Sequence, residues 1–174
     1  MSKFKLSTLA VAVSALGMLG FSTVSQADQN VVDQLSQLKV NVKVTDNRAA
    51  ENGVDCAALG ADWAACNQSV ITLTSDSDIK AKDWAIYFHN PRQVLDVKND
   101  QFKITFVTGD LHKIEPTDKF KGFTAGQAVE IPLIGEYWQL FESDVMPRWY
   151  VTSQDAKPKV IASTDTEDLR QFVT

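Results

Sequence analysis

The chain has 174 residues, with 17 basic and 22 acidic side chains and a formal net charge of −5 at neutral pH. An acidic chain lacks the basic footprint that nucleic-acid phosphates or an anionic membrane surface require, so we expect neither as a partner. Neutral ligands such as sugars are compatible with this charge, because ring stacking and neutral hydrogen bonds need no net charge.

The first 27 residues show the three regions of a secretory signal peptide. Two lysines give a positive start, residues 6–20 are apolar and small, and residues 25–27 (Ser-Gln-Ala) form a small-x-small cleavage pattern. The apolar run is too short to span a membrane. A mitochondrial transit peptide is the alternative, but the segment has no arginine and is not amphipathic. We therefore expect cleavage after residue 27 and a periplasmic or secreted chain, with residues 28–174 as a single domain.

The chain contains two cysteines, Cys56 and Cys66. In an exported protein this pair predicts one disulfide, which would stabilise the fold by about 2–3 kcal/mol through closure of a short loop. A metal site is the alternative, but it needs about four ligands at tight spacing. Neither His89 nor His112 lies near the cysteines in the sequence, so we expect no metal.

Apolar and polar residues alternate with a period of two through most of the chain, which predicts short β-strands. We expect strands at residues 38–45, 70–74, 84–89, 93–97, 102–106, 111–115, 129–134, 137–141, 148–152 and 159–161. Turn signals recur about every 8–12 residues, as is typical of an antiparallel sandwich. The pattern therefore predicts an all-β fold.

Helix is expected to be scarce. Residues 30–38 are compatible with a turn, and so is the loop between the cysteines. Residues 165–170 have the pattern of a helix start, with Thr164 as a cap.

The sequence contains no motif typical of a catalytic site. It has no glycine-rich phosphate loop, no Gly-x-Ser-x-Gly elbow and no His-Glu-x-x-His zinc motif. Neither histidine has a recognisable orienting acid for a serine triad. Turn chemistry explains many of the acidic residues better than the paired carboxylates of a glycosidase, as at Asp76, Asp78, Asp110 and Asp118. We therefore expect a non-catalytic segment with no cofactor.

Tryptophan and tyrosine side chains offer a different kind of site, because their flat rings can stack on the apolar face of a sugar. Core packing is the alternative for each of them. Trp84 alternates in phase with Ile86 and Phe88, so we expect it in the core. Core packing or a domain interface is also favoured for Trp138 and Trp149.

Four residues are our candidates for contact with a sugar. Trp63 comes first because a short disulfide loop would fix its ring, although buried and exposed positions are equally open for it. Trp138 comes with it, since Trp138 and Tyr137 are expected to point to opposite faces of one strand. Tyr87 and His89 come second, on the strand face opposite the expected core, where a solvated outer face is the alternative.

Several linked motifs resemble a known family. They are VDQLSQLK (32–39), DNRA (46–49), ENGVDCAALGADW (51–63), KDW (82–84), IYFH (86–89), PRQ (91–93), LHKIEP (111–116), EYWQLF (136–141) and PRWY (147–150). In these motifs the chain resembles the N-terminal domain of bacterial chitobiase, a family 20 β-N-acetylhexosaminidase that is exported in Gram-negative bacteria. The resemblance covers nearly all of residues 28–174.

The resemblance implies a β-sandwich similar to cellulose-binding modules, described as a carbohydrate-binding domain. In the parent enzymes a later (β/α)8 barrel carries a catalytic Asp-Glu pair, and the substrate's acetamido group is the nucleophile. This chain ends before that barrel, and none of its residues matches the pair. The resemblance therefore implies a non-catalytic domain that binds chitin-type oligosaccharides or polysaccharide and adjoins the catalytic domains of a glycosidase involved in chitin degradation.

Two other interpretations stay open. A structural module would dock on the rest of the glycosidase and bind no sugar, which predicts one contiguous apolar patch. An independent enzyme would need a cleft with convergent carboxylates. Sugar binding instead predicts two or three coplanar exposed aromatic rings.

Overall fold

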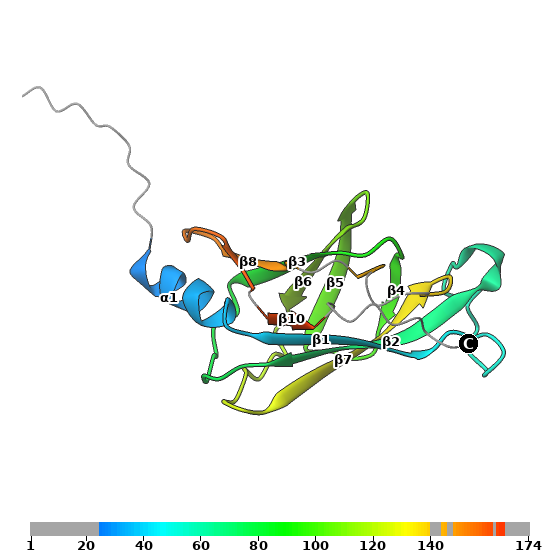
Figure 1. The fold of residues 1–174 in the computed structure, drawn as a ribbon, viewed down its shortest axis with the longest axis horizontal. Helices are drawn as coiled ribbons and strands as arrows, with labels where there is room; N and C mark the ends of the chain where they lie inside the picture. The colour runs from blue at the N-terminus through cyan, green and yellow to red at the C-terminus, as the bar shows by residue number, and fades with distance from the viewer. Residues whose placement is uncertain (1–24, 140–143, 146–147, 162, 166–174) are drawn as a thin grey trace, which may run out of the picture.

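The structure, a computed structural model, describes residues 25–139, 144–145, 148–161 and 163–165. It contains two five-stranded sheets (Figure 1). In spatial order, the first sheet consists of β10 (Ser163–Asp165), β1 (Lys39–Asp46), β2 (Cys66–Thr74), β7 (Ala128–Glu136) and β4 (Val94–Val97). The second consists of β5 (Phe102–Thr108), β6 (Leu111–Pro116), β3 (Trp84–His89), β8 (Tyr150–Ser153) and β9 (Lys159–Val160). Neighbouring strands are antiparallel except β1 and β10, so the predicted antiparallel sandwich is confirmed.

Alternation along the strands decides which side chains form the core. In β1, Val40 and Val42 are buried, and the alternating Lys39, Asn41 and Lys43 are exposed. In β3, Trp84, Ile86 and Phe88 are buried, as expected from their spacing. These side chains join apolar residues of the other strands in one cluster between the sheets. Burial of each such side chain contributes about 1.5–3 kcal/mol.

A ten-residue helix, α1 (Gln26–Leu35), precedes the first strand. This helix begins earlier than the turn expected at 30–38, because Ser25 caps its N-terminus. The Ser25 hydroxyl accepts a hydrogen bond from the backbone N–H of Asp28. Val32 and Leu35, one turn apart, pack into the core. The expected cleavage site after residue 27 lies inside the first turn of this helix. None of the described helices is both long and apolar enough to cross a membrane.

Two expected elements differ from the structure. The strand expected at 137–141 does not form at residues 137–139: β7 ends at Glu136, and Tyr137 has the left-handed φ of +55°, which takes the chain out of the ladder. The helix expected from residue 165 does not begin there. Thr164 of β10 pairs with Val40 of β1, and Asp165 is the last residue of β10. Residues 140–141 and 166–170 lie outside the described residues.

The tryptophans for which a core position was favoured differ in their burial. Trp149 is fully buried and stacks on Phe88, with ring centroids 4.6 Å apart. Trp138 is 43% exposed, so it does not lie in the core, which was one of the two positions expected for it beside a domain interface. The reason is the left-handed Tyr137, after which Trp138 no longer follows the alternation of a strand.

Candidate functional site

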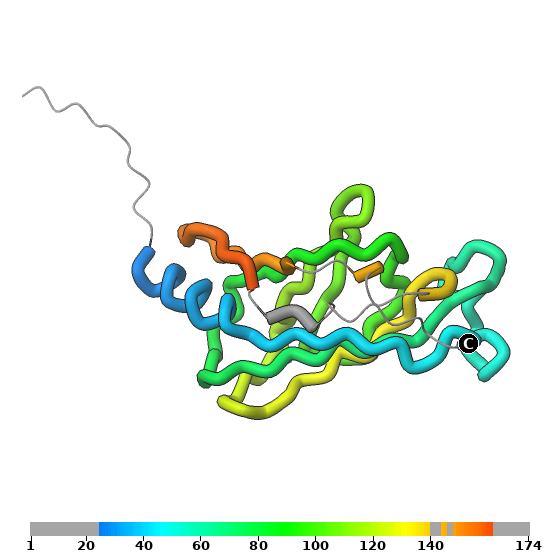
Figure 2. Tube along the Cα trace, in the orientation of Figure 1, coloured from blue at the N-terminus to red at the C-terminus, as the bar shows by residue number. Residues whose placement is uncertain are grey.

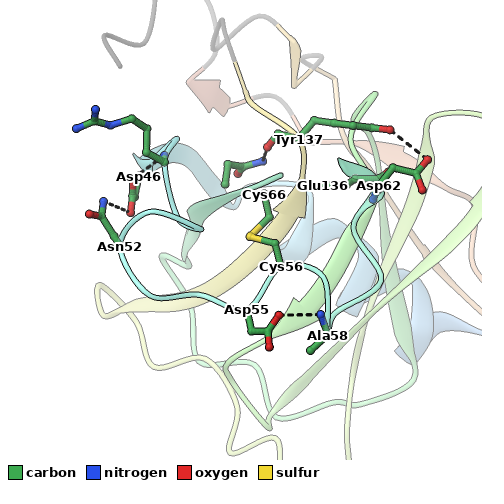
Figure 3. Close-up of a disulfide and its surroundings, with 11 residues drawn as sticks. Asp46, Asn52, Asp55, Cys56, Ala58, Asp62, Cys66, Glu136 and Tyr137 are labelled. Carbon is green, nitrogen blue, oxygen red and sulfur yellow. Dashed lines mark hydrogen bonds between the residues drawn. A yellow bond between two sulfur atoms is a disulfide. The ribbon is translucent and has the colours of Figure 1, made fainter. Parts of the chain in front are cut away.

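The loop between β1 and β2 lies at the end of the first sheet, opposite the end that carries α1 (Figures 1 and 2). The predicted disulfide between Cys56 and Cys66 forms within it, with Cα atoms 5.7 Å apart (Figure 3). Around the disulfide a small apolar cluster is formed by Ala49, Cys56, Ala61, Cys66 and Ile134. The loop is therefore attached to the sheet by a covalent bond and by packing. No group of His, Cys, Asp or Glu side chains in the described ranges is suited to hold a metal ion.

The register of β2 and β7 brings two distant segments together. Cys66, the first residue of β2, pairs with Glu136, the last residue of β7. The residues just before β2 therefore meet those just after β7. Two hydrogen bonds join the segments: the backbone N–H of Tyr137 donates to the carbonyl of Ala65 at 2.8 Å, and the backbone N–H of Asp62 donates to Oε1 of Glu136 at 3.2 Å.

Trp63 lies in the short 3-10 turn η1 (Asp62–Ala64) at this meeting point. Its side chain is 86% exposed. Trp63 and Ala64 have φ values of +56° and +52°, a left-handed conformation that is uncommon for residues with a Cβ. Such backbone persists only where the surroundings over-determine it, and it concentrates at binding sites and active sites.

The rings of Tyr137 and Trp63 are nearly perpendicular, with centroids 5.9 Å apart and planes at 75°. The Tyr137 hydroxyl donates a hydrogen bond to Oδ2 of Asp62 at 3.2 Å (Figure 3). Partial burial and this carboxylate raise the pKa of the Tyr137 phenol above its ordinary value. The phenol donates this hydrogen bond in its protonated form, which the raised pKa favours.

Arg92 covers part of the same ring. Its guanidinium carbon lies 5.6 Å from the centroid of Tyr137, which is a cation–π distance, and its Nε donates to the carbonyl of Trp138 at 2.9 Å. We call this group of five residues the aromatic corner: Asp62, Trp63, Arg92, Tyr137 and Trp138.

Two of the four sugar-contact candidates, Trp63 and Trp138, belong to the aromatic corner. Asp62, Arg92 and Tyr137 were not among the site residues predicted from the sequence, because their contacts join positions about 45 to 75 residues apart. The adjacent aromatics at 137 and 138 were the only signal for Tyr137 in the sequence.

The other two candidates lie on β3, in the second sheet. Tyr87 pairs with Tyr150 of β8, and their rings stack in parallel with centroids 4.9 Å apart. One face of each ring is therefore covered by the other. His89 places Nδ1 2.9 Å from Oδ1 of Asp110, and this hydrogen bond lowers the pKa of the Asp110 carboxyl. Both candidates are thus engaged with other side chains.

A family model described as "Putative carbohydrate binding domain" matches residues 37–174. The chain belongs to this family. The family expected from the sequence motifs is therefore confirmed.

Curated relatives agree with this family. The chain is 50% identical over 167 residues to the N,N'-diacetylchitobiase of Vibrio harveyi, covering 94% of this chain and 19% of the relative. It is 33% identical to the beta-hexosaminidase of Vibrio vulnificus, covering 86% of this chain and 18% of that protein. The chain thus spans about a fifth of the length of these relatives.

Solved structures are similar at lower sequence identity. The GH20 exo β-N-acetylglucosaminidase from Vibrio harveyi in complex with N-acetylglucosamine gives a TM-score of 0.49 at 16% identity, covering 74% of this chain and 18% of that one. The ChBD2 domain from Thermococcus kodakarensis gives 0.39 at 12% identity, covering 71% and 92%.

Proposed function

We propose that this domain binds chitin-type saccharides and has no catalytic role of its own. The observation that carries the proposal is the aromatic corner: Trp63 offers an open ring on a disulfide-closed loop, and the Asp62 carboxylate and the Arg92 guanidinium contact the neighbouring Tyr137 side chain. Protein sites for sugars combine these two elements, an aromatic platform for the apolar ring face and polar groups for the hydroxyls. Membership of the carbohydrate-binding family and the chitobiase relative support the same ligand class.

The distribution of exposed apolar side chains supports sugar binding over docking. A docking module should present one contiguous apolar patch. Among the described residues the large exposed ones fall into three places: Trp63 and Trp138 in the aromatic corner, Phe106 and Val107 on β5, and Val160 on β9. Strands β5 and β9 are opposite edges of the second sheet, so these side chains do not form one surface.

The proposed role is that of an accessory domain in an exported glycosidase. It would hold chitin-type saccharides near catalytic domains that lie outside this chain. We expect a periplasmic or secreted location, with cleavage after residue 27. N-terminal sequencing of the exported protein tests this, and a retained Met1 would contradict it.

Binding is tested with the purified chain in two assays, depletion from solution by insoluble chitin and calorimetric titration with the N-acetylglucosamine hexamer. Cellulose and an empty resin are the controls. Binding in either assay supports the proposed function, and failure in both refutes it. The chain should not hydrolyse a chromogenic N-acetylglucosaminide, and turnover that scales with its concentration would show an active site.

A further inference from the structure

The aromatic corner has the wrong shape for a flat ligand. A protein that adheres to the surface of an insoluble polysaccharide needs several rings in one plane. Here the planes of Trp63 and Tyr137 meet at 75°. Two rings at nearly a right angle cannot both lie flat on one surface.

The two rings also differ in what they leave open. Trp63 is 86% exposed, so it has a free ring face. Tyr137 has the nearly perpendicular ring of Trp63 at 5.9 Å and the guanidinium carbon of Arg92 at 5.6 Å from its centroid. Of these two rings, only that of Trp63 is an open stacking platform, with Tyr137 as a wall beside it, and one platform covers about one sugar ring.

Polar groups contact the Tyr137 side chain that forms the wall. Asp62 directly precedes Trp63, and its carboxylate accepts a hydrogen bond from the Tyr137 hydroxyl. A carboxylate has about four acceptor positions, so this one can accept further hydrogen bonds from sugar hydroxyls or an acetamido N–H. The guanidinium of Arg92 brings additional donors. These groups suit the rim of a single sugar unit standing on Trp63.

The corner is held in this geometry before any ligand binds. The Cys56–Cys66 disulfide closes the loop, and the Tyr137 backbone is bonded to Ala65. A site that is already ordered loses little conformational entropy on binding. This small loss matters most for a small ligand, because its few contacts can offset only a small cost.

Building on the proposed function, we propose that the aromatic corner binds one or two units of a soluble chitin-type oligosaccharide, and that the domain does not adhere to the flat surface of insoluble chitin. Trp63 stacks on the sugar ring, Tyr137 forms the wall, and Asp62 and Arg92 bond the substituents at the rim.

Titration of the full chain with the N-acetylglucosamine monomer, dimer, trimer and hexamer tests the proposal. Affinity should level off by the dimer or trimer, and insoluble chitin should not deplete the chain from solution. Trp63→Ala should lower the affinity about tenfold, in line with the loss of one stacking contact. Phe106→Ala, which removes an exposed ring from β5, is the matched control and should bind like the wild type.

Two further variants separate the roles within the corner. Tyr137→Phe keeps the wall but removes the hydrogen bond to Asp62, and should weaken binding less than Trp63→Ala does. Because Trp63 is exposed, Trp63→Ala should keep the wild-type melting temperature, so its loss of affinity reports contact and not unfolding.

Three results would overturn the proposal. Affinity that rises with each unit up to the hexamer would indicate an extended site, and depletion by insoluble chitin without saturable oligosaccharide binding would indicate a flat one. Unchanged affinity in Trp63→Ala would place the site elsewhere. All three leave the proposed function intact, whereas binding neither to the oligosaccharides nor to insoluble chitin refutes both.

Discussion

The side-chain amide of Asn67 donates a hydrogen bond to the backbone carbonyl of Tyr137, with 3.0 Å between Nδ2 and the oxygen. Asn67 is buried in β2, and its Oδ1 accepts the hydroxyl hydrogen of Ser69 at 2.6 Å. Gly135 leaves room for this amide, since a Cβ at position 135 would lie 2.7 Å from Nδ2. A buried polar residue of the sheet thus supports the left-handed backbone that orients the Tyr137 ring.

Replacement of Asn67 should therefore affect both stability and binding. Asn67→Ala leaves the Tyr137 carbonyl and the Ser69 hydroxyl without this partner, which should lower the free energy of unfolding by about 1–3 kcal/mol. Urea denaturation measures the change, and titration of the folded variant should show weaker binding of the N-acetylglucosamine trimer. Gln68→Ala, at the next position of the same strand, is the control and should change both quantities little. Wild-type binding by Asn67→Ala would show that Tyr137 is held in place by other contacts.

Loss of the disulfide should destabilise the domain. The double variant Cys56→Ala, Cys66→Ala should reduce the free energy of unfolding by about 2–3 kcal/mol, because the short loop is no longer closed in the unfolded chain. Reducing agent should lower the wild-type midpoint to a similar value and leave the variant unchanged. Two reactive thiols in exported wild-type protein would contradict the disulfide itself.

The tryptophans should separate into structural and exposed residues. Trp149→Ala removes a fully buried ring and should cost about 3–5 kcal/mol of stability. Trp63→Ala removes an exposed ring and should change stability by no more than about 0.5 kcal/mol. Denaturation curves compare the two directly. A large loss of stability in Trp63→Ala would mean that its contact with Tyr137 is structural.

His112 should make the fold sensitive to mild acid. It is buried beside Phe88 and Phe106, its Nδ1 lies 3.0 Å from the carbonyl oxygen of Asp110, and its Nε2 has no hydrogen-bond partner among the described residues. Burial lowers the pKa of His112 below its ordinary value of 6.5, although the Asp110 carbonyl acts in the opposite direction. The unfolded chain therefore binds more protons than the folded one as the pH falls below about 6.5.

The resulting prediction concerns the slope of stability with pH. Between pH 7 and pH 5 the free energy of unfolding should fall, by at most about 1.4 kcal/mol per pH unit for one proton. His112→Gln should flatten this slope, whatever its effect at neutral pH. An equal slope in His112→Gln would assign the acid sensitivity to other groups.

The alternation of apolar and polar residues correctly predicted strands whose side chains alternate between the core and the solvent. The alternation at residues 38–45 predicted β1, and the spacing of Trp84, Ile86 and Phe88 predicted which face of β3 is buried. The same reasoning failed at Tyr137, where a strand was expected. An alternating pattern cannot show that Asn67 and Ala65 will bond the Tyr137 backbone and turn it out of the ladder.

The sequence by itself determined the sandwich class, the disulfide, the family and two members of the aromatic corner. Only the tertiary structure decided that Trp63 and Tyr137 share one site. The physical reason is register: Cys66 pairs with Glu136, so the residue three positions before β2 meets the residue directly after β7. Strand register depends on the packing of the whole sheet, and no local spacing of residues encodes the 75° angle between these two rings.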